Sequence, residues 1–197
     1  MKKPLCLSLM SLALLSGCSM SMNMMRNKND PARERQTVSV VNAMTWTNPL
    51  SGKPDGVRTT WPLAQLAGHE EIFPLAQIKN CPQKEGGGVA PCTWGVLSAS
   101  RNITRYEYMN GGITLDLDLL VDVHRRQQDR RRNFHTSMAI PNDVPALQYR
   151  KALQHGVALP YGKVYRIDLE YGLRFEICAQ RLDQDGRALD KCEIPYI

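Results

Sequence analysis

The clearest pattern in the chain is an alternation of apolar and polar residues between Gly112 and His124. The aliphatic side chains occupy the odd positions, as Ile113, Leu115, Leu117, Leu119, Val121 and Val123. Alternate residues of a β-strand share a face, whereas a helix would scatter these side chains around its circumference. The pattern therefore predicts an antiparallel strand with one face in a core and the other in water.

Neighbouring segments predict further strands. Asn110-Gly111 is a hairpin turn signal that connects this strand to a preceding one around 94–109, and the arginine-rich segment 125–132 turns the chain again. Strands are also expected over Thr37–Thr47, along an inward row of Phe134, Thr136, Met138 and Ile140, over 165–171 and over 173–179.

Two segments favour other structures. Pro62 can begin a helix and Pro74 would interrupt one, so one short helix or irregular turns are expected over 62–79. One or two helical turns are expected over 149–156. The total of about seven strands, with turn signals between them, is typical of an all-β, mainly antiparallel sandwich with one or two short helices. No linker divides residues 36–197, so a single domain is expected.

The amino end carries a different pattern. Lys2 and Lys3 precede an apolar run from Leu5 to Leu15. A basic start, a short apolar run and a small-residue junction make a secretory signal peptide. The run is shorter than the roughly 20 residues that span a bilayer. The junction Leu15-Ser16-Gly17-Cys18 resembles the lipobox of bacterial lipoproteins.

This resemblance implies that residues 1–17 are a signal peptide and that Cys18 becomes an amino terminus carrying fatty acyl chains such as palmitate. Residues 18–35 are then an acylated flexible tether, and residues 36–197 form the sandwich domain. In lipoproteins of this kind an aspartate after the cysteine marks retention in the inner membrane. Ser19 therefore implies, in a Gram-negative host, the outer membrane with the domain facing the periplasm, and the lipid bilayer is the first expected partner.

Export bears on the other cysteines. Cys6 leaves with the signal peptide and Cys18 takes lipid, and the rest are Cys81, Cys92, Cys178 and Cys192. An even number of cysteines in an oxidising compartment predicts disulfides. Neither close pair has the two-to-four-residue spacing of zinc ligands, so no metal site is expected.

Local sequence indicates how these cysteines pair. Cys178 and Cys192 flank the turn signal 183–186, and folding the chain about that turn places them opposite each other at cross-strand spacing. Cys81 and Cys92 enclose a glycine-rich segment with no core-forming pattern. Linking its ends removes entropy from the unfolded chain. The expected bridges are therefore 81–92 and 178–192.

The formal net charge of the chain is +6. Part of this charge gathers in one short segment, as Arg125, Arg126, Arg130, Arg131 and Arg132. Such a cluster can bind nucleic acid, anionic lipid or an acidic partner, and export argues against nucleic acid. Charge runs are mostly exposed, so a solvated hairpin tip is the favoured structural interpretation. The functional interpretation is a partner-binding surface.

Candidate chemistry is sparse. Asp116 and Asp118 share a strand face about 6.6–6.8 Å apart, and Asp122 follows on the same face. Paired carboxylates can cleave sugar bonds or bind calcium, but the polar face of an amphipathic strand also predicts them. The histidines lack metal-ligand spacing, and these are His69, His124, His135 and His155. Neither G-x-S-x-G nor S-x-x-K occurs in the exported part, so no catalytic residue or cofactor is expected.

The preferred function is a non-enzymatic accessory or structural subunit of a cell-envelope assembly, such as a secretion or surface-fibre system. The expected contact surfaces with its protein partner are the loop 81–92, the irregular segment 48–79 and the arginine cluster. The alternative is a periplasmic ligand-binding, enzyme-inhibitor or immunity lipoprotein. A third hypothesis is a hydrolase that uses Asp116, Asp118 and a histidine.

Overall fold

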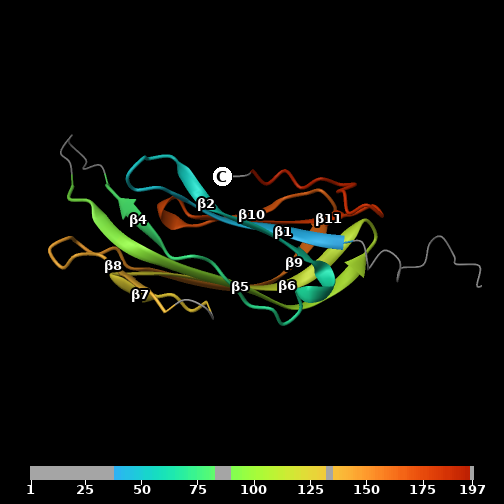
Figure 1. Ribbon diagram of the computed structural model, residues 1–197, viewed down its shortest axis with the longest axis horizontal. Coiled ribbons are helices and arrows are strands. Elements are labelled where there is room, and N and C mark those ends of the chain that lie inside the picture. The colour runs from blue at the N-terminus through green and yellow to red at the C-terminus, as the bar shows by residue number, and fades with distance from the viewer. Residues whose placement is uncertain (1–37, 83–89, 132–134, 196–197) are drawn as a thin grey trace, which may run out of the picture. The chain divides into compact units, whose positions relative to one another are not determined.

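The computed structural model describes residues 38–82, 90–131 and 135–195 (Figure 1). The strands are β1 (Val38–Thr47), β2 (Pro54–Pro62), β3 (Glu71–Ile72), β4 (Ala76–Asn80), β5 (Thr93–Met109), β6 (Gly112–His124), β7 (Arg126–Gln128), β8 (Ser137–Ala139), β9 (Tyr149–Pro160), β10 (Tyr165–Asp168) and β11 (Arg174–Arg181). Two 3-10 helices are present in these ranges, η1 (Leu63–Gln65) and η2 (Glu170–Gly172). None of the helices in the described ranges has the length and apolar character needed to cross a bilayer.

Two antiparallel sheets form the body of the domain. The 4-stranded sheet has the order β10-β11-β1-β2, and the 5-stranded sheet has the order β3-β5-β6-β9 with β4 also paired to β5. Figure 1 shows β1 and β2 in one layer and the long β5 in the other. Met44 and Phe175 of the first sheet join Leu117 and Val121 of the second in one apolar core. The chain is therefore an all-β sandwich, as the alternation predicts.

The strand predicted over Gly112–His124 is confirmed as β6. It pairs with β5 on one side and with β9 on the other, which places Leu117 opposite Ile103 and His155. Its odd-numbered aliphatic side chains are at most 2% exposed, whereas Asp116 faces solvent. The hairpin between β5 and β6 turns at Gly111, whose φ of 74° favours glycine.

Strand β1 is buried on both faces. It lies between β11 and β2, and Val40 faces the core between the sheets. Val41 points to the other side, where Cys192 and Ile194 pack on it. The carboxyl-terminal segment 182–195 therefore covers part of the outer face of the 4-stranded sheet.

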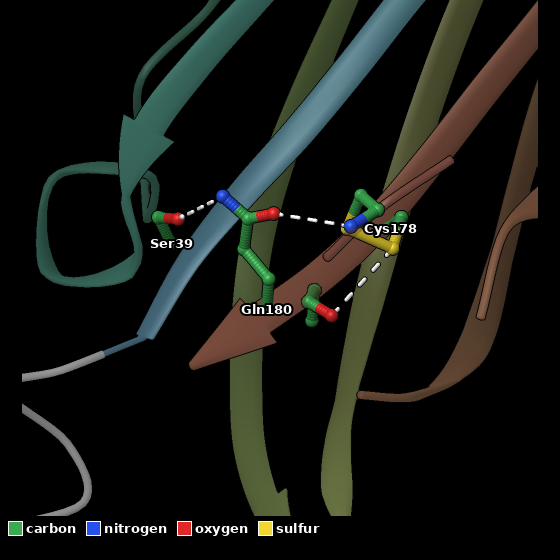
Figure 2. Close-up of a disulfide and its surroundings, with 5 residues drawn as sticks. Ser39, Cys178 and Gln180 are labelled. Atoms are coloured by element: carbon green, nitrogen blue, oxygen red, sulfur yellow. Dashed lines mark hydrogen bonds between the residues drawn. A yellow bond between two sulfur atoms is a disulfide. The ribbon is translucent and has the colours of Figure 1, made fainter. Parts of the chain in front are cut away.

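The predicted Cys178–Cys192 disulfide is confirmed, with Cα atoms 5.9 Å apart. Its geometry differs from the predicted cross-strand pair, because β11 already pairs with β1 and β10. Cys192 instead reaches Cys178 over the face of the sheet. Beside it, the Gln180 amide donates to Ser39 Oγ and accepts from the Cys192 N–H, both at 3.2 Å (Figure 2).

The predicted Cys81–Cys92 disulfide is also confirmed, with Cα atoms 4.2 Å apart. It joins the end of β4 to the start of β5, directly beyond the antiparallel pair of Asn80 and Thr93. The bridge therefore fixes β4 against β5 at this end of the sheet. Residues 83–89 of the enclosed loop lie outside the described residues.

The prediction of helical turns over 149–156 is wrong, because this segment belongs to β9. Tyr149, Leu153 and Val157 recur every four residues, which imitates a helical period. Lys151 and His155 alternate with these residues on the inward face of β9. Because β9 is an edge strand, they lie at the rim of the core, where their polar atoms stay in contact with solvent. The sequence of β9 therefore does not alternate clearly between apolar and polar residues, because the strand lies at the edge of the sheet.

Other boundaries also differ. The segment expected as an inward row over 134–140 forms β8, which pairs with β7 in a separate 2-stranded sheet; Phe134 lies outside the described residues. The strand expected over 165–171 ends at Asp168, because η2 follows with Tyr171 at φ 59°. The short helix expected over 62–79 is η1, but β3 and β4 also form there, so the strands exceed the predicted seven.

Candidate functional site

The arginine hairpin, residues 125–140, begins where β6 ends. Its strands β7 and β8 are antiparallel, with Arg126 opposite Ala139. At its base the Arg125 guanidinium donates to the carbonyl oxygens of Pro141 and Val144, the latter at 3.0 Å. These bonds tie the base of the hairpin to the segment that leaves it.

An ion pair closes the tip of the hairpin. Asp129 accepts from the backbone N–H of Arg131 at 3.0 Å and from Nη2 of the same residue at 2.5 Å. The Asp129 side chain is only 4% exposed, and its hydrogen bonds from Arg131 lower the pKa of the carboxyl group. The charge of Arg131 is therefore engaged within the hairpin.

The hairpin covers part of the outer face of the 5-stranded sheet (Figure 1). Ser98 and Ser100 point away from the core, yet they are only 6% and 5% exposed. Strands β7 and β8 both contact β5, and Arg130 Nη2 lies 3.5 Å from Ser100 Oγ. The described strands of the hairpin, β7 and β8, are therefore packed against β5.

The expectation of a freely solvated arginine tip is corrected for two of its members. Arg125 and Arg131 are partly buried and held by the bonds above, because the hairpin folds back on the sheet. Arg126 and Arg130 are exposed, and neither forms an ion pair with a described residue. Arg132 lies outside the described residues.

Two hollows meet beside the hairpin. One, of about 420 Å³, lies among the turn between β1 and β2, the start of β4 and the hairpin, and is lined by Trp46, Asn48, Pro49, Leu50, Asp55, Leu75, Ala76, Gln77 and Met138. The other, of about 330 Å³, is lined by Leu75, Asp129, Arg131, Thr136, Ser137 and Met138. Leu75 and Met138 belong to both, so the hollows form one surface, called here the Leu75–Met138 groove.

Local sequence fixes the walls of this groove. Asn48 Oδ1 accepts from the N–H groups of Leu50 and Ser51, which forms a tight polar turn between β1 and β2. This turn leaves the Leu50 side chain 87% exposed at the groove. On the other wall, the Cys81–Cys92 bridge fixes β4 and with it the neighbouring Leu75.

The groove combines apolar side chains with charged ones, because Asp55, Asp129 and Arg131 also line it. Pro49, Leu50, Leu75 and Met138 supply the apolar part. Asp129 of the hairpin is paired with Arg131. The exposed Arg126 and Arg130 lie on the same hairpin but do not line the groove. The groove therefore offers apolar contact, and the hairpin beside it adds two exposed positive charges.

The structure joins two of the three predicted contact surfaces. The segment 48–79 supplies Leu50 and Leu75, and the arginine hairpin supplies Met138. The described ends of the loop 81–92 lie beyond β4, and its central residues lie outside the described ones. The sequence did not predict that Leu75 and Met138 line the same groove, because this depends on how the hairpin folds back.

A second depression lies on the outer face of the 5-stranded sheet. It measures about 590 Å³ and is lined by Glu70, Ser100, Asn102, Asp118, Leu119, Leu120, Ala152, Leu153 and Gln154. Asn102 and Asp118 are opposite each other in register, and Oδ1 of each is buried with no hydrogen-bond partner in the described structure. Because its lining combines these unpaired acceptors with apolar side chains, the depression can hold a ligand that donates hydrogen bonds.

The carboxylates of the hydrolase hypothesis occupy this outer face. Asp116 is exposed and Asp118 half-buried, as their alternation on β6 predicts. His155 is opposite Leu117, so it faces inward, where its Nε2 lies 3.1 Å from the Tyr165 hydroxyl. His124 is about 20 Å along the strand from Asp118, by six residues of strand rise, and lies 3.0 Å from Asp122. Neither histidine therefore joins the aspartate pair.

The other histidines lie elsewhere. His69 packs on the ring of Trp61 at 4.7 Å between centroids, and His135 is exposed within the arginine hairpin. No group of at least three histidine, cysteine, aspartate or glutamate side chains suited to a metal ion occurs in the described ranges.

A buried ion pair inside the sandwich was not anticipated. Arg101 is 0% exposed and its Nη2 donates to Glu71 Oε2 at 2.7 Å. Its Nε donates to Asn42 Oδ1 at 2.8 Å and its Nη1 to the His69 carbonyl at 3.2 Å. Burial lowers the pKa of the Arg101 guanidinium, while Glu71 raises it. The network links β1, β3 and β5 across the core.

The sequence contains a signal for this network. Along β5, Leu97, Ala99 and Ile103 alternate as inward residues, and Arg101 occupies an inward position among them. A charged residue on the apolar face of a strand needs a buried partner. That partner, Glu71, lies on a two-residue strand with no recognisable period.

Comparisons with known proteins give no relative. No protein-family model, no curated protein and no solved structure matches this chain. The lipobox-like segment and its Cys18 lie outside the described residues.

Proposed function

We propose that this chain is an exported, lipid-anchored protein of the outer membrane that acts as a non-enzymatic accessory subunit of a cell-envelope assembly. The Leu15–Cys18 pattern supports the anchor, and the two disulfides support an oxidising compartment. Mass spectrometry of the protein from its host tests the anchor. An acylated Cys18 at the amino terminus is expected, and an unmodified Met1 would contradict it.

The Leu75–Met138 groove is the observation that carries the binding role. Leu50 is 87% exposed at its border, and two exposed arginines, Arg126 and Arg130, lie on the neighbouring hairpin. Exposed apolar surface rimmed by polar residues marks interaction sites. The occupant we propose is an extended segment of another envelope protein that carries an apolar side chain next to acidic residues.

Photo-cross-linking in intact cells tests this role. A benzophenone amino acid replaces Leu50 in the groove or, as a matched control, Leu189, which is also an exposed leucine at 62%. A specific protein adduct is expected from position 50 and not from position 189. The adduct should disappear when Arg126→Glu and Arg130→Glu are added, because these arginines lie on the hairpin that forms one wall of the groove and opposite charges assist association.

Two results would refute the role of the groove. One is the absence of an adduct at position 50 in the assembled envelope. The other is an adduct that forms equally at both leucines or survives the charge reversal, because such an adduct reports collision rather than recognition. Mapping the adduct to a segment that lacks acidic residues would also contradict the proposed occupant.

The depression on the outer face favours a second candidate, a ligand-binding or enzyme-inhibitor lipoprotein. Asp118 lines this depression, whereas Asp116 lies on the same strand face but lines a different hollow. A ligand or enzyme that binds here should lose affinity with Asp118→Ala and keep it with Asp116→Ala, as measured by calorimetric titration. Equal effects of both variants would exclude the depression as the site.

A further inference from the structure

Most edges of the two main sheets carry features that block the addition of another strand. Strand β2 begins and ends with proline, and β10 has only 4 residues. The β3–β4 edge is interrupted by 73–75, which includes Pro74. Short strands, prolines and interruptions are the devices that protect sheet edges from pairing with other chains.

Strand β9 is the exception. Its 12 residues pair with β6 without a register shift, and no strand in the described parts of the chain pairs with its other edge. Arg150 and Lys151 lie at one end and Pro160 at the other. The middle, 152–159, contains no lysine, arginine, aspartate, glutamate or proline. A long uncharged edge of this kind is a template for a further strand.

The hydrogen bonds of β9 show which of its backbone N–H and C=O groups face the open edge. The N–H of Tyr161 donates to the carbonyl of Gly111 at 3.0 Å, in the same register as the β6–β9 ladder. Odd-numbered residues of β9 therefore direct their backbone groups toward β6. In an antiparallel ladder alternate residues point the other way, so even-numbered residues direct theirs to the open edge. These even-numbered residues are all exposed, and they are Arg150, Ala152, Gln154, Gly156 and Ala158.

We propose that this edge pairs, antiparallel, with the β9 edge of a second copy of the chain. A two-fold axis through Gln154 places Gln154 opposite its own counterpart and Ala152 opposite Gly156. This register engages every even-numbered N–H from residue 150 to residue 158. Shifting it by two residues toward the end of the strand sets Arg150 against Pro160, which has no N–H to donate.

Side chains and charges favour a second copy as the occupant. The two Gln154 amides meet at the axis, and each has both donors and an acceptor. Arg150 lies opposite Ala158 and Lys151 opposite Val157, so no like charges face each other across the pair. A two-fold axis perpendicular to the sheet keeps both outer faces on the same side, which leaves room for each 4-stranded sheet beneath. This inference is independent of the Leu75–Met138 groove.

Single cysteines in the full chain test the register. Hydrogen-bonded residues that lie opposite each other have Cα atoms about 5.5 Å apart, within the disulfide range of about 4.4–6.8 Å. Gln154→Cys should therefore form a covalent dimer when the detergent-solubilised protein is oxidised with copper phenanthroline. Ala158→Cys is the matched control, because its counterpart lies about 27 Å away along the strand.

The expected result is a reducible dimer from Q154C and none from A158C above the level of the unsubstituted chain. The comparison also controls for copies that merely share a micelle, because both cysteines would then react. Absence of the Q154C dimer, or equal dimers from both variants, overturns the proposal. A Q154C adduct with a different envelope protein also overturns it, since it assigns the edge to another partner.

A proline variant adds a second measurement. Ala152→Pro removes an N–H that points to the open edge and leaves the β6 ladder intact. Combined with Q154C, it should abolish the covalent dimer while both native disulfides and the far-ultraviolet circular dichroism are retained. A folded double variant that still cross-links at the Q154C level would contradict strand pairing.

Discussion

The buried Arg101–Glu71 pair gives the sharpest test of how the two sheets are held together. Arg101 is 0% exposed and donates to Glu71, Asn42 and the His69 carbonyl. Arg101→Met keeps a long apolar side chain but removes every one of these donors. Among the described residues, Glu71, at 8% exposed, then keeps two hydrogen-bond donors, Asn42 Nδ2 and Trp61 Nε1.

The expected loss is large. Removing one partner of a buried ion pair destabilises a protein by about 3–5 kcal/mol, because the remaining charge is left in a poorly solvating interior. Domains are commonly stable by only about 5–15 kcal/mol, so the variant should lie near the limit of folding. Adding Glu71→Leu removes the buried carboxylate that has lost its ion-pair partner. The double variant should therefore be more stable than Arg101→Met alone.

Urea unfolding of the chain from Ser19 onward, with disulfides intact and tryptophan fluorescence as the signal, measures these free energies. Arg174→Met is the matched control, because the Arg174–Asp168 pair is 45% and 65% exposed. An exposed pair contributes at most about 1 kcal/mol, so the control should change little. A loss for Arg101→Met no larger than for the control, or a double variant less stable than the single one, would refute the reasoning.

Three further outcomes are expected. The lowered pKa of Asp129 means that its ionised form stabilises the hairpin above the ordinary carboxyl pKa of 3.8, and this contribution is lost as acid protonates the group. The unsubstituted chain should therefore lose stability below about pH 4. Asp129→Asn should flatten this pH dependence in acid titrations followed by circular dichroism. Replacing Cys178 and Cys192 with alanine opens a loop with a separation of 14 residues, which should cost about 3 kcal/mol in urea unfolding, and an unchanged midpoint would contradict it. Gly112→Ala places a Cβ against the carbonyl oxygen of Leu159 inside van der Waals contact, so the melting temperature should fall by an amount equivalent to about 1–3 kcal/mol; an unchanged melting temperature would show that the backbone relaxes freely.

Much of the sandwich could be predicted because its central strands obey a simple period. β6 is buried on one face only, so its side chains alternate and its boundaries follow directly. The disulfides could be predicted because each pair encloses one short segment. β9 was missed since an edge strand has polar residues on both faces, and the local period then carries little information.

The candidate site could be predicted only in pieces. Arg125–Arg132 and the segment 48–79 stand out in the sequence as charged or irregular. Their meeting at Leu75 and Met138 depends on the hairpin folding over Ser100, a long-range contact that leaves no local pattern. Arg101 is the opposite case, because its inward position is visible in the sequence while its partner is not.

The pairing of β1 with β11 has a consequence for how the chain is made. Val38 lies opposite Arg181, so the first described strand finds one of its two neighbours almost at the carboxyl end. Contacts between residues far apart in sequence slow folding, because a long loop must close before they form. During synthesis β1 therefore emerges long before this neighbour exists. This delay is compatible with the proposed export, because translocation machinery that needs an extended polypeptide would act before the domain closes.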